Sequence, residues 1–342
     1  MDTYYVPNVS YGEAASGLGW LVWVGLCSLI ASGCVSGPPS TVRIQPGGTH
    51  ADDFDLAKPT RLTVSTFNVW GLPSWVNRAS SSRFRRIAWE LPQLGSDVVL
   101  LQEVWTRRCF EDLSQPVTDS NRTWWAASAR RKGSFLGQNG LLTLSRYPIA
   151  DARVMHFSTA HLPDSLMNKG ALKTTIIAGG QRFNVWNVHL QDGPCGRVRS
   201  CQIAELIKWV QESDDGQVAD IVGGDFNFTP GTREFDQLVA TIGPSVHELS
   251  GDTVLPTWDG LSTRPGAGEA LDHIFVRMRE PVEQVHAWPR RIFTAARIED
   301  RLSDHMGMEA RLTFGTATTT PEPILTESTT AAWLETSALM HQ

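Results

Sequence analysis

VADIVGGDFN, residues 218–227, is the stretch that decides the fold of this chain. The run from Val218 to Val222 has the length and apolar character of a buried β-strand. After two glycines, Asp225 and Asn227 flank Phe226, so both polar side chains would point to the same side of an extended backbone. The stretch therefore predicts a buried strand that carries polar groups to one end of a sheet.

Five more short polar signatures follow or adjoin apolar runs elsewhere in the chain. They are Phe67-Asn68-Val69-Trp70, Leu101-Gln102-Glu103-Val104, Asn187-Val188-His189-Leu190-Gln191, Leu271-Asp272-His273-Ile274 and Ser303-Asp304-His305. Strands of one sheet can deliver such ends to a common cleft. Gathered there, they would supply carboxylates, amides and imidazoles, which are the groups used in metal-assisted hydrolysis.

Strand-like and helix-like segments alternate along the chain. We expect strands at 62–69, 98–103, 124–128, 141–145, 171–178, 183–190, 218–224, 271–276 and 307–312. We expect helices at 81–94, 199–212 and 231–241. This mixture predicts α/β layers around a sheet core, and we find no internal repeat.

The composition is that of an ordinary globular protein, with 342 residues, 41% apolar and 19% charged residues, and a formal charge of -6. Residues 60–314 are long enough for one large domain or two small ones, and we assign them to a single catalytic domain on the motifs described below. The negative charge argues mildly against a protein that holds long nucleic acid by neutralising its phosphates. A local cluster such as Arg130-Arg131-Lys132 nevertheless leaves a nuclease open.

Residues 1–34 have the features of an export leader. The apolar stretch 18–33 has about the length of a signal-peptide core and ends in Ala31-Ser32-Gly33-Cys34. This ending resembles the lipobox of bacterial lipoproteins, in which the cysteine becomes the acylated N-terminus. Residues 1–17 contain no Lys or Arg, so a plain secretory signal and an uncleaved anchor remain alternatives. We expect an exported bacterial protein, membrane-tethered or secreted.

Two segments that flank the expected domain are rich in small and polar residues. Residues 35–59 would form a flexible linker, and residues 315–342, dominated by Thr, Ser, Ala, Pro and Glu, would form a disordered tail. In an exported protein, Cys195 and Cys201 would be disulfide partners or two separate loop thiols. Cys109 would then be a buried or free thiol.

The order and wording of the motifs resemble the endonuclease/exonuclease/phosphatase superfamily over residues 62–312. The strongest matches are the Gly-Gly-Asp-Phe-Asn run at 223–227 and Ser303-Asp304-His305. The resemblance implies a four-layered α/β sandwich of two packed mixed sheets with helices outside. It also implies a divalent cation, Mg²⁺ or alternatively Mn²⁺ or Co²⁺, and attack by water on a phosphate ester.

Within the superfamily, the chain is most similar to neutral sphingomyelinases and other phospholipase-C-type enzymes. His-Leu-Gln at 189–191 is followed by Arg199 and Gln202, as in that branch, and Asp164 and Lys169 precede a glycine. Nucleases of the superfamily often carry Asn-x-Asp at the first motif, and Trp70 stands here at the position of that aspartate. These signals favour the lipid-hydrolysing branch over the nucleases.

The resemblance assigns roles to the base and metal residues. His305 would be the general base, with Asp272 fixing its tautomer. Glu103, a hard oxygen donor at a strand end, would bind the cation, unless it forms only a salt bridge there. Asn68 would offer its oxygen or N–H to the metal shell or a phosphate, and Asp304 would approach the metal or brace its loop.

The remaining site residues would handle the phosphate and the head group. Asn227 and His189 would contact phosphate oxygens, and Asp225 would orient the nucleophile or protonate the leaving oxygen. Lys169 would approach the phosphate, with Asp164 as a gate that pairs with it. Five of the thirteen tryptophans lie near motif ends or in loops, namely Trp70, Trp75, Trp105, Trp258 and Trp288. Trp70 and Trp258 are the best candidates to line the cleft against a choline head group.

These residues favour hydrolysis of sphingomyelin to ceramide and phosphocholine by activated water, with no covalent intermediate because no nucleophilic Ser or Cys motif is present. The expected partner is a phospholipid or other phosphodiester at a membrane surface, and we expect a monomer. One alternative is an exported DNase-like endonuclease of the same fold. Another is a catalytically inactive binding or toxin-like module, although the complete polar set argues against it.

Overall fold

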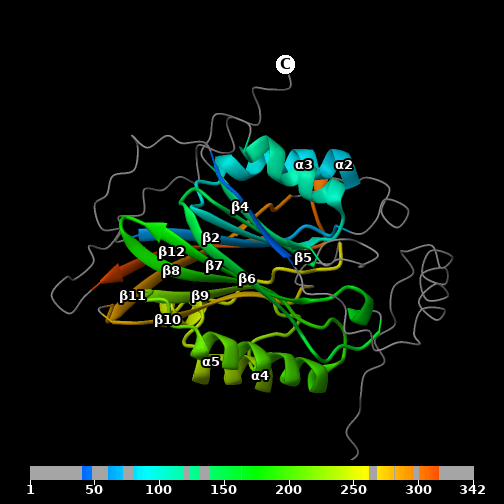
Figure 1. Ribbon diagram of the computed structural model, residues 1–342. Coiled ribbons are helices and arrows are strands. Elements are labelled where there is room, and N and C mark those ends of the chain that lie inside the picture. The colour runs from blue at the N-terminus through cyan, green and yellow to red at the C-terminus, as the bar shows by residue number, and fades with distance from the viewer. Residues whose placement is uncertain are drawn as a thin grey trace, which may run out of the picture.

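The computed structural model describes residues 41–47, 61–71, 80–118, 124–130, 139–162, 164–261, 268–280, 282–295 and 300–315. Figure 1 shows two sheets packed face to face, with α2 and α3 over one of them and α4 and α5 over the other. This is the expected four-layered sandwich.

The larger sheet has seven strands and the smaller has five. In spatial order the first contains β1 (Thr41–Gln45), β4 (Trp125–Arg130), β5 (Gly140–Ser145), β3 (Val98–Val104), β2 (Arg61–Asn68), β12 (Gly307–Gly315) and β11 (Gln284–Ile292). The second contains β10 (Asp272–Met278), β9 (Ala219–Asp225), β8 (Gln181–His189), β7 (Gly170–Ala178) and β6 (Ile149–His156). Parallel and antiparallel neighbours occur in both, as expected for mixed sheets.

Apolar side chains fill the three interfaces between the four layers. The helices are α2 (Ser80–Glu90), α3 (Arg107–Thr118), α4 (Gly196–Glu212), α5 (Arg233–Thr241) and the short α6 (Val246–Ser250), with 3-10 turns η1 (Leu91–Gln93) and η2 (Asp164–Leu166). Leu100 and Ile221 belong to the core between the sheets. Ile87 of α2 belongs to the apolar cluster between the first sheet and its covering helices. Leu206 of α4 belongs to the cluster between the second sheet and its covering helices.

The strand directions bring the polar signatures to one end of the sandwich. In the parallel pair β2–β3, Asn68 lies opposite Gln102, and in the parallel pair β8–β9, His189 lies opposite Asp225. The antiparallel strand β10 begins at this same end, with Asp272 opposite Asp225. We call this the cleft end.

Every strand and helix expected from the sequence is present. The helices α3 and α6 were not expected, and neither were three strands, all of which are edge strands. β1 and β11 are the edges of the seven-stranded sheet, and β6 is an edge of the other. β6 and β11 are only partly buried, so they lack the continuous apolar run that marks a central strand. β11 even contains Pro289, which an edge strand tolerates because one side of its backbone has no sheet partner.

Part of the expected linker is ordered. Thr41–Gln45 forms β1 and pairs with β4, so a flexible linker over 35–59 is wrong for these five residues. The expected leader (1–34), the rest of that linker apart from 46–47, and residues 316–342 of the tail lie outside the described residues. No helix in the part of the chain that the structure describes is long and apolar enough to span a bilayer.

His273 gives the fold a predicted sensitivity to acid. Its ring is buried among Phe226, Phe228, Phe235 and Phe275, and its Nε2 lies 2.9 Å from the carbonyl oxygen of Phe228. Burial lowers the pKa of His273 to about 4. Because the unfolded chain takes up this proton near pH 6.5, about 3 kcal/mol of stability present at neutral pH should disappear as the pH falls from about 6.5 to about 4.

Urea unfolding at several pH values would measure this effect. His273→Leu should flatten the acid dependence of the unfolding free energy between pH 4 and 6.5 relative to the natural chain. His286→Leu, at an exposed position of β11, is the matched control and should leave it unchanged. An unaltered slope in His273→Leu would contradict the prediction.

Candidate active site

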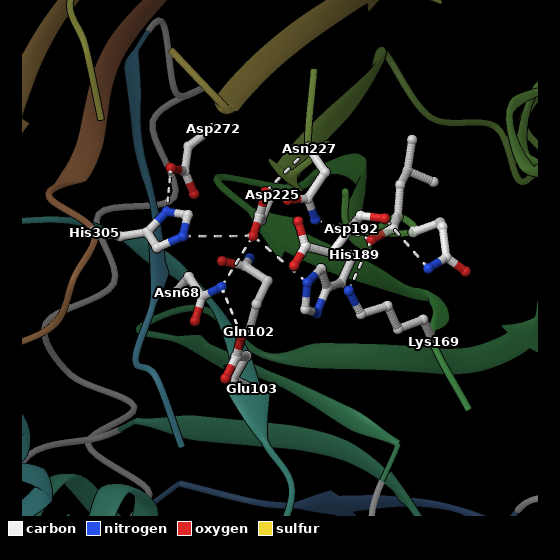
Figure 2. Close-up of polar contacts among 12 residues, drawn as sticks. Asn68, Gln102, Glu103, Lys169, His189, Asp192, Asp225, Asn227, Asp272 and His305 are labelled. Carbon is white, nitrogen blue, oxygen red and sulfur yellow. Dashed lines mark hydrogen bonds and ion pairs between the residues drawn. The ribbon is translucent and has the colours of Figure 1, made fainter. Parts of the chain in front are cut away.

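The Asp225 carboxylate is the centre of the polar cluster at the cleft end (Figure 2). Its Oδ2 accepts a hydrogen bond from Asn68 Nδ2 at 2.9 Å and lies 3.5 Å from His189 Nε2 and 3.8 Å from His305 Nε2. Its Oδ1 accepts from the backbone N–H of Asn227 at 3.0 Å. Residues that are distant in sequence therefore meet at one buried carboxylate, as the motifs predicted.

The close approach of β9 to β8 just before Asp225 requires glycine at position 224. A Cβ at Gly224 would lie 1.9 Å from the carbonyl oxygen of Val188, on the neighbouring strand β8. Asp225 itself is buried, and burial raises its pKa to about 7, although the charge of His305 opposes this shift. Near neutral pH, Asp225 can therefore either hold or release a proton.

The predicted pairing of His305 with Asp272 is confirmed. His305 Nδ1 lies 2.9 Å from Asp272 Oδ2, so the carboxylate fixes the tautomer and leaves Nε2 directed at Asp225. Thr257 Oγ1 accepts from the backbone N–H of Asp272 at 3.0 Å and anchors that strand end. Burial would lower the pKa of His305, but Asp272 and Asp225 outweigh it and raise the pKa to about 10.

His189 is the second imidazole of the site, and it is neutral. Burial, together with the charges of Lys169 and His305, holds its pKa well below the usual range. Its ring centroid lies 5.9 Å from that of Trp105, and its Nδ1 is buried without a hydrogen-bond partner among the described residues. A neutral imidazole next to Asp225 can donate an N–H without adding charge to the resting site.

Glu103 combines burial, strain and an unused oxygen. It has φ 62°, a conformation that non-glycine residues adopt rarely. Its Oε1 accepts from Asn68 Nδ2 at 3.2 Å, whereas its buried Oε2 has no donor within the described residues. Burial raises the pKa of Glu103, and repulsion from Asp304 raises it further.

Asn68 joins the two carboxylates as a donor. The same Nδ2 that donates to Asp225 also donates to Glu103, and its Oδ1 accepts from the backbone N–H of Trp70 at 2.9 Å. Of the two orientations that the sequence left open, the structure thus has the N–H facing the cluster. Coordination of a cation by Asn68 stays a prediction, and it would require the amide oxygen, which accepts from Trp70 in this arrangement, to face the cation.

A divalent cation fits the carboxylate side of the cluster. Among the described residues no three acidic, imidazole or thiol side chains converge as a ready-made cage. Mg²⁺ needs no such cage, because it commonly binds one or two carboxylates and keeps several waters. The donorless Oε2 of Glu103, with the negative charge of Asp304 nearby, is the kind of group that such a cation would satisfy.

Lys169 and Asp164 form the expected pair on the other side of Asp225. Lys169 Nζ lies 2.7 Å from Asp164 Oδ2 and donates to the carbonyl oxygen of Leu190 at 3.0 Å. Asn227 Nδ2 donates to the same carbonyl at 3.0 Å, so the pair adjoins the central cluster. Burial would lower the pKa of Lys169, but Asp164 and Asp192 outweigh it and raise the pKa. Contact of Lys169 with a phosphate stays a prediction.

Arg199 and Gln202, which marked the lipid-hydrolysing branch, hold the loop beside this pair. Arg199 Nη1 donates to the carbonyl oxygen of Gln191 at 3.2 Å, and the Gln202 side chain accepts from the Gln191 N–H at 2.9 Å. Gln202 also donates to the carbonyl oxygen of Thr159 at 2.8 Å. These hydrogen bonds hold the segment that follows His189.

Strained backbone concentrates in this region. Besides Glu103, the residues Trp70 (φ 48°), Asn168 (φ 52°) and Asn227 (φ 54°) also have positive φ. Trp70 and Asn227 belong to the site signatures, and Asn168 precedes Lys169, whereas Leu261 and Phe293, which also have positive φ, lie outside them. Such conformations cost free energy and persist where the surrounding structure holds a functional group in place.

The five tryptophans singled out in the sequence differ in burial and position. Trp70 and Trp258 are half-buried, and Trp258 pairs through its backbone with His305, so both lie at the cleft end. Trp105 is buried, and Trp288 lies on the edge strand β11. Trp75 lies outside the described residues.

Arg83 of α2 supports the site, although no sequence pattern marks it. Its guanidinium donates to the backbone carbonyls of Val69, Trp70 and Leu302. The first two follow Asn68, and the third precedes Ser303, whose hydroxyl donates to the carbonyl of Asn68 at 2.7 Å. The planar guanidinium of Arg83 thus links the first signature to the last by hydrogen bonds, although more than two hundred residues separate the two signatures in the sequence.

Replacing Arg83 by Met should therefore slow catalysis as well as destabilise the fold. We expect kcat to fall by about 10- to 100-fold, because the loops that carry Asn68 and His305 lose their common support, and unfolding to become easier by about 2 kcal/mol or more. Arg86→Met, an exposed position on the same helix, is the matched control. Kinetics on the folded variant, verified by circular dichroism, would check this, and an unchanged kcat would contradict it.

The predicted disulfide is absent. Cys195 and Cys201 are both free thiols. Cys195 is the residue before α4 and Cys201 lies inside that helix. Six residues of helix separate the two positions by about 9 Å along the axis and turn them to different sides, which is too far for a disulfide. Cys109 is buried, as one of the alternatives expected.

This chain is similar in sequence to known proteins. The sequence profile of the Endonuclease/Exonuclease/phosphatase family matches residues 65–305. Sphingomyelinase C of Bacillus cereus is 27% identical over 229 residues, which cover 58% of this chain and 67% of that protein. Phospholipase C of Staphylococcus aureus is 25% identical over 207 residues, covering 53% of this chain and 62% of that protein. The chain thus spans 67% and 62% of the length of these two relatives, and 52% of the length of one from Drosophila melanogaster.

Solved structures share the fold at lower identity. Beta toxin of Staphylococcus aureus with bound magnesium ions superposes with a TM-score of 0.56 at 21% identity, covering 73% of this chain and 98% of that one. D. rerio TDP2 complexed with a single-strand DNA product superposes with a TM-score of 0.60 at 20% identity, covering 74% and 99%. One sandwich thus serves proteins that bind different classes of ligand, so substrate has to be argued from the site.

Proposed function

This chain belongs to the endonuclease/exonuclease/phosphatase family, and from that premise we propose that it is an exported, metal-dependent phosphodiesterase of the phospholipase C type acting on sphingomyelin. Water would attack phosphorus, the bond from phosphorus to the ceramide oxygen would break, and ceramide and phosphocholine would leave. The observation that carries the proposal is the Asp272-held imidazole of His305, which faces Asp225 in the same cluster as the unsatisfied oxygen of Glu103.

His305 would take the proton from the attacking water. Asp272 stabilises the imidazolium that results, and Nε2 is the nitrogen free to act. Asp225, with a pKa of about 7, can carry a proton near neutral pH, which suits protonation of the leaving ceramide oxygen. Of the two roles considered for Asp225, we favour this one.

The phosphate would lie between Asn227, His189 and the carboxylate side of the cluster. Neutral His189 can donate to a phosphate oxygen as negative charge grows in the transition state. A divalent cation held by Glu103 and its neighbour Asp304 would supply Lewis-acid polarisation of the phosphate and would oppose protonation of His305. Lys169 would add positive charge to the phosphate side if it leaves Asp164.

Three observations favour a lipid over a nucleic acid as substrate. Relatives that match the chain are named sphingomyelinase C and phospholipase C. The Asp164–Lys169 pair and the Arg199–Gln202 brace, which marked that branch, are both formed. Trp70 supplies an aromatic side chain beside Asn68. The side chains of the basic cluster at 130–132, which a nuclease rim would use, lie outside the described residues.

A substrate panel tests the proposal. The purified chain would be incubated with sphingomyelin, phosphatidylcholine, lysophosphatidylcholine and plasmid DNA, with Mg²⁺ or with chelator. We expect phosphocholine release from sphingomyelin that the chelator abolishes. Cleaved plasmid with intact lipids would establish the nuclease instead, and Mg²⁺ binding with no hydrolysis of any substrate would establish a binding module.

A further inference from the structure

The edge strand β1 enters the fold at the cleft end. Thr41 lies opposite Arg130 of β4, whose Ser128 lies opposite Leu142 of β5. β5 in turn brings Gly140 opposite Val104, the residue after Glu103. The start of β1 is therefore level with the ends of the strands that carry the site. At about 4.8 Å per strand, three strand spacings put Thr41 about 15 Å from Val104.

The chain before β1 is short, so it limits how the domain can be oriented relative to a membrane that holds Cys34 or residues 18–33. Six residues separate Cys34 from Thr41. Even when fully extended, this piece of chain can reach only about 25 Å. A lipid on Cys34, or an apolar leader retained at 18–33, would therefore hold the bilayer surface close to the cleft end.

The cleft end also offers apolar contacts of its own. Leu162 is 45% exposed and is one of three exposed large apolar side chains among the described residues. It lies in the connection between β6 and β7, and the pairing of His156 with Gly170 places that connection at the cleft end. Half-buried Trp70 and Trp258 lie at this end too, and tryptophan favours the water–lipid interface.

We propose that the cleft end is a membrane-docking surface, held by the chain that precedes β1 against the phospholipid membrane that carries the anchor. The proposal rests on the proposed function, because it takes export and a lipid substrate as given. The position of the chain entry beside the site is what orients the domain on the membrane. Lipid head groups of a bilayer at this surface then lie within reach of His305.

Photo-crosslinking on the full chain tests the orientation. p-Benzoyl-phenylalanine would replace either Leu162 or Asp214, which is exposed in the α4–β9 connection at the opposite end. Both proteins would be produced in a bacterial host that processes lipoproteins and reconstituted in vesicles of phosphatidylcholine and sphingomyelin. We expect lipid adducts at 162 at several times the yield at 214. Equal yields, or a higher yield at 214, would overturn the proposal, as would failure of the natural chain to float with the vesicles.

A longer tether provides a second test. Inserting about twenty Gly and Ser residues between Pro39 and Ser40 should lower hydrolysis of vesicle sphingomyelin by about tenfold, because the local concentration of the surface falls. Hydrolysis of a water-soluble, short-chain sphingomyelin should not change. Loss of neither activity would overturn the docking surface, whereas a natural chain without activity on the soluble substrate would overturn the proposed function instead.

Discussion

Replacing His305 by Gln should lower the rate of phosphodiester hydrolysis by about 1000-fold or more, because glutamine cannot take the proton from water. The fold should survive, since Gln can still donate to Asp272, which lies 2.9 Å from the natural imidazole. Initial rates with a saturating substrate, together with a thermal unfolding curve, would measure both effects. His286→Gln, at an exposed position of β11, is the matched control.

The pH profile gives this prediction its sharpest form. Asp272 and Asp225 raise the pKa of His305 to about 10, so the imidazole is protonated at neutral pH before a cation binds. Only the deprotonated form of His305 can act as a base, so this group makes activity rise with pH, whereas Asp225, which must hold a proton to act as the acid, makes activity fall as the pH passes its pKa of about 7. The residual activity of His305→Gln should lack this rise. A variant that keeps both the rate and the profile would remove His305 from the mechanism.

Replacing Glu103 by Gln should weaken Mg²⁺ binding on the order of 100-fold or more and abolish measurable hydrolysis. The same change should leave the metal-free fold as stable as before, or more so. Burial raises the pKa of Glu103, and its Oε2 has no donor, so the ionised carboxylate is unfavourable in the folded protein without a cation. A neutral amide removes that cost.

Isothermal titration with Mg²⁺ and thermal unfolding with and without the ion would separate these effects. Mg²⁺ should raise the unfolding temperature of the natural chain but not of Glu103→Gln, because only a folded protein with an intact site gains stability from the ion. Glu111→Gln, an exposed residue of α3, is the matched control. Equal Mg²⁺ affinity in Glu103→Gln and the natural chain would show that the cation binds elsewhere.

The central strands and their polar ends could be predicted because a strand that is buried on both faces has a recognisable sequence of consecutive apolar residues. A strand covered on both faces, such as β3, must be nearly continuous in apolar residues until Gln102 and Glu103. The partly exposed edge strands β1, β6 and β11 have no such continuous apolar run, which is why β1 was assigned to a linker and β6 and β11 were missed. The disulfide between Cys195 and Cys201 was wrong because cysteine spacing does not reveal that a helix begins between them.

Taken alone, the sequence determined the layered fold, the family and the set of polar side chains that meet at Asp225, since each follows from a local pattern of apolar runs and strand ends. Only the tertiary structure decided how those groups are used: which way the amide of Asn68 points, which oxygen of Glu103 lacks a donor, and that Arg83 joins the loops of the first and last signatures. Those properties arise from contacts between segments far apart in the chain. Burial and the charges of such neighbours, neither of which any local stretch specifies, set the protonation of His305 and Asp225.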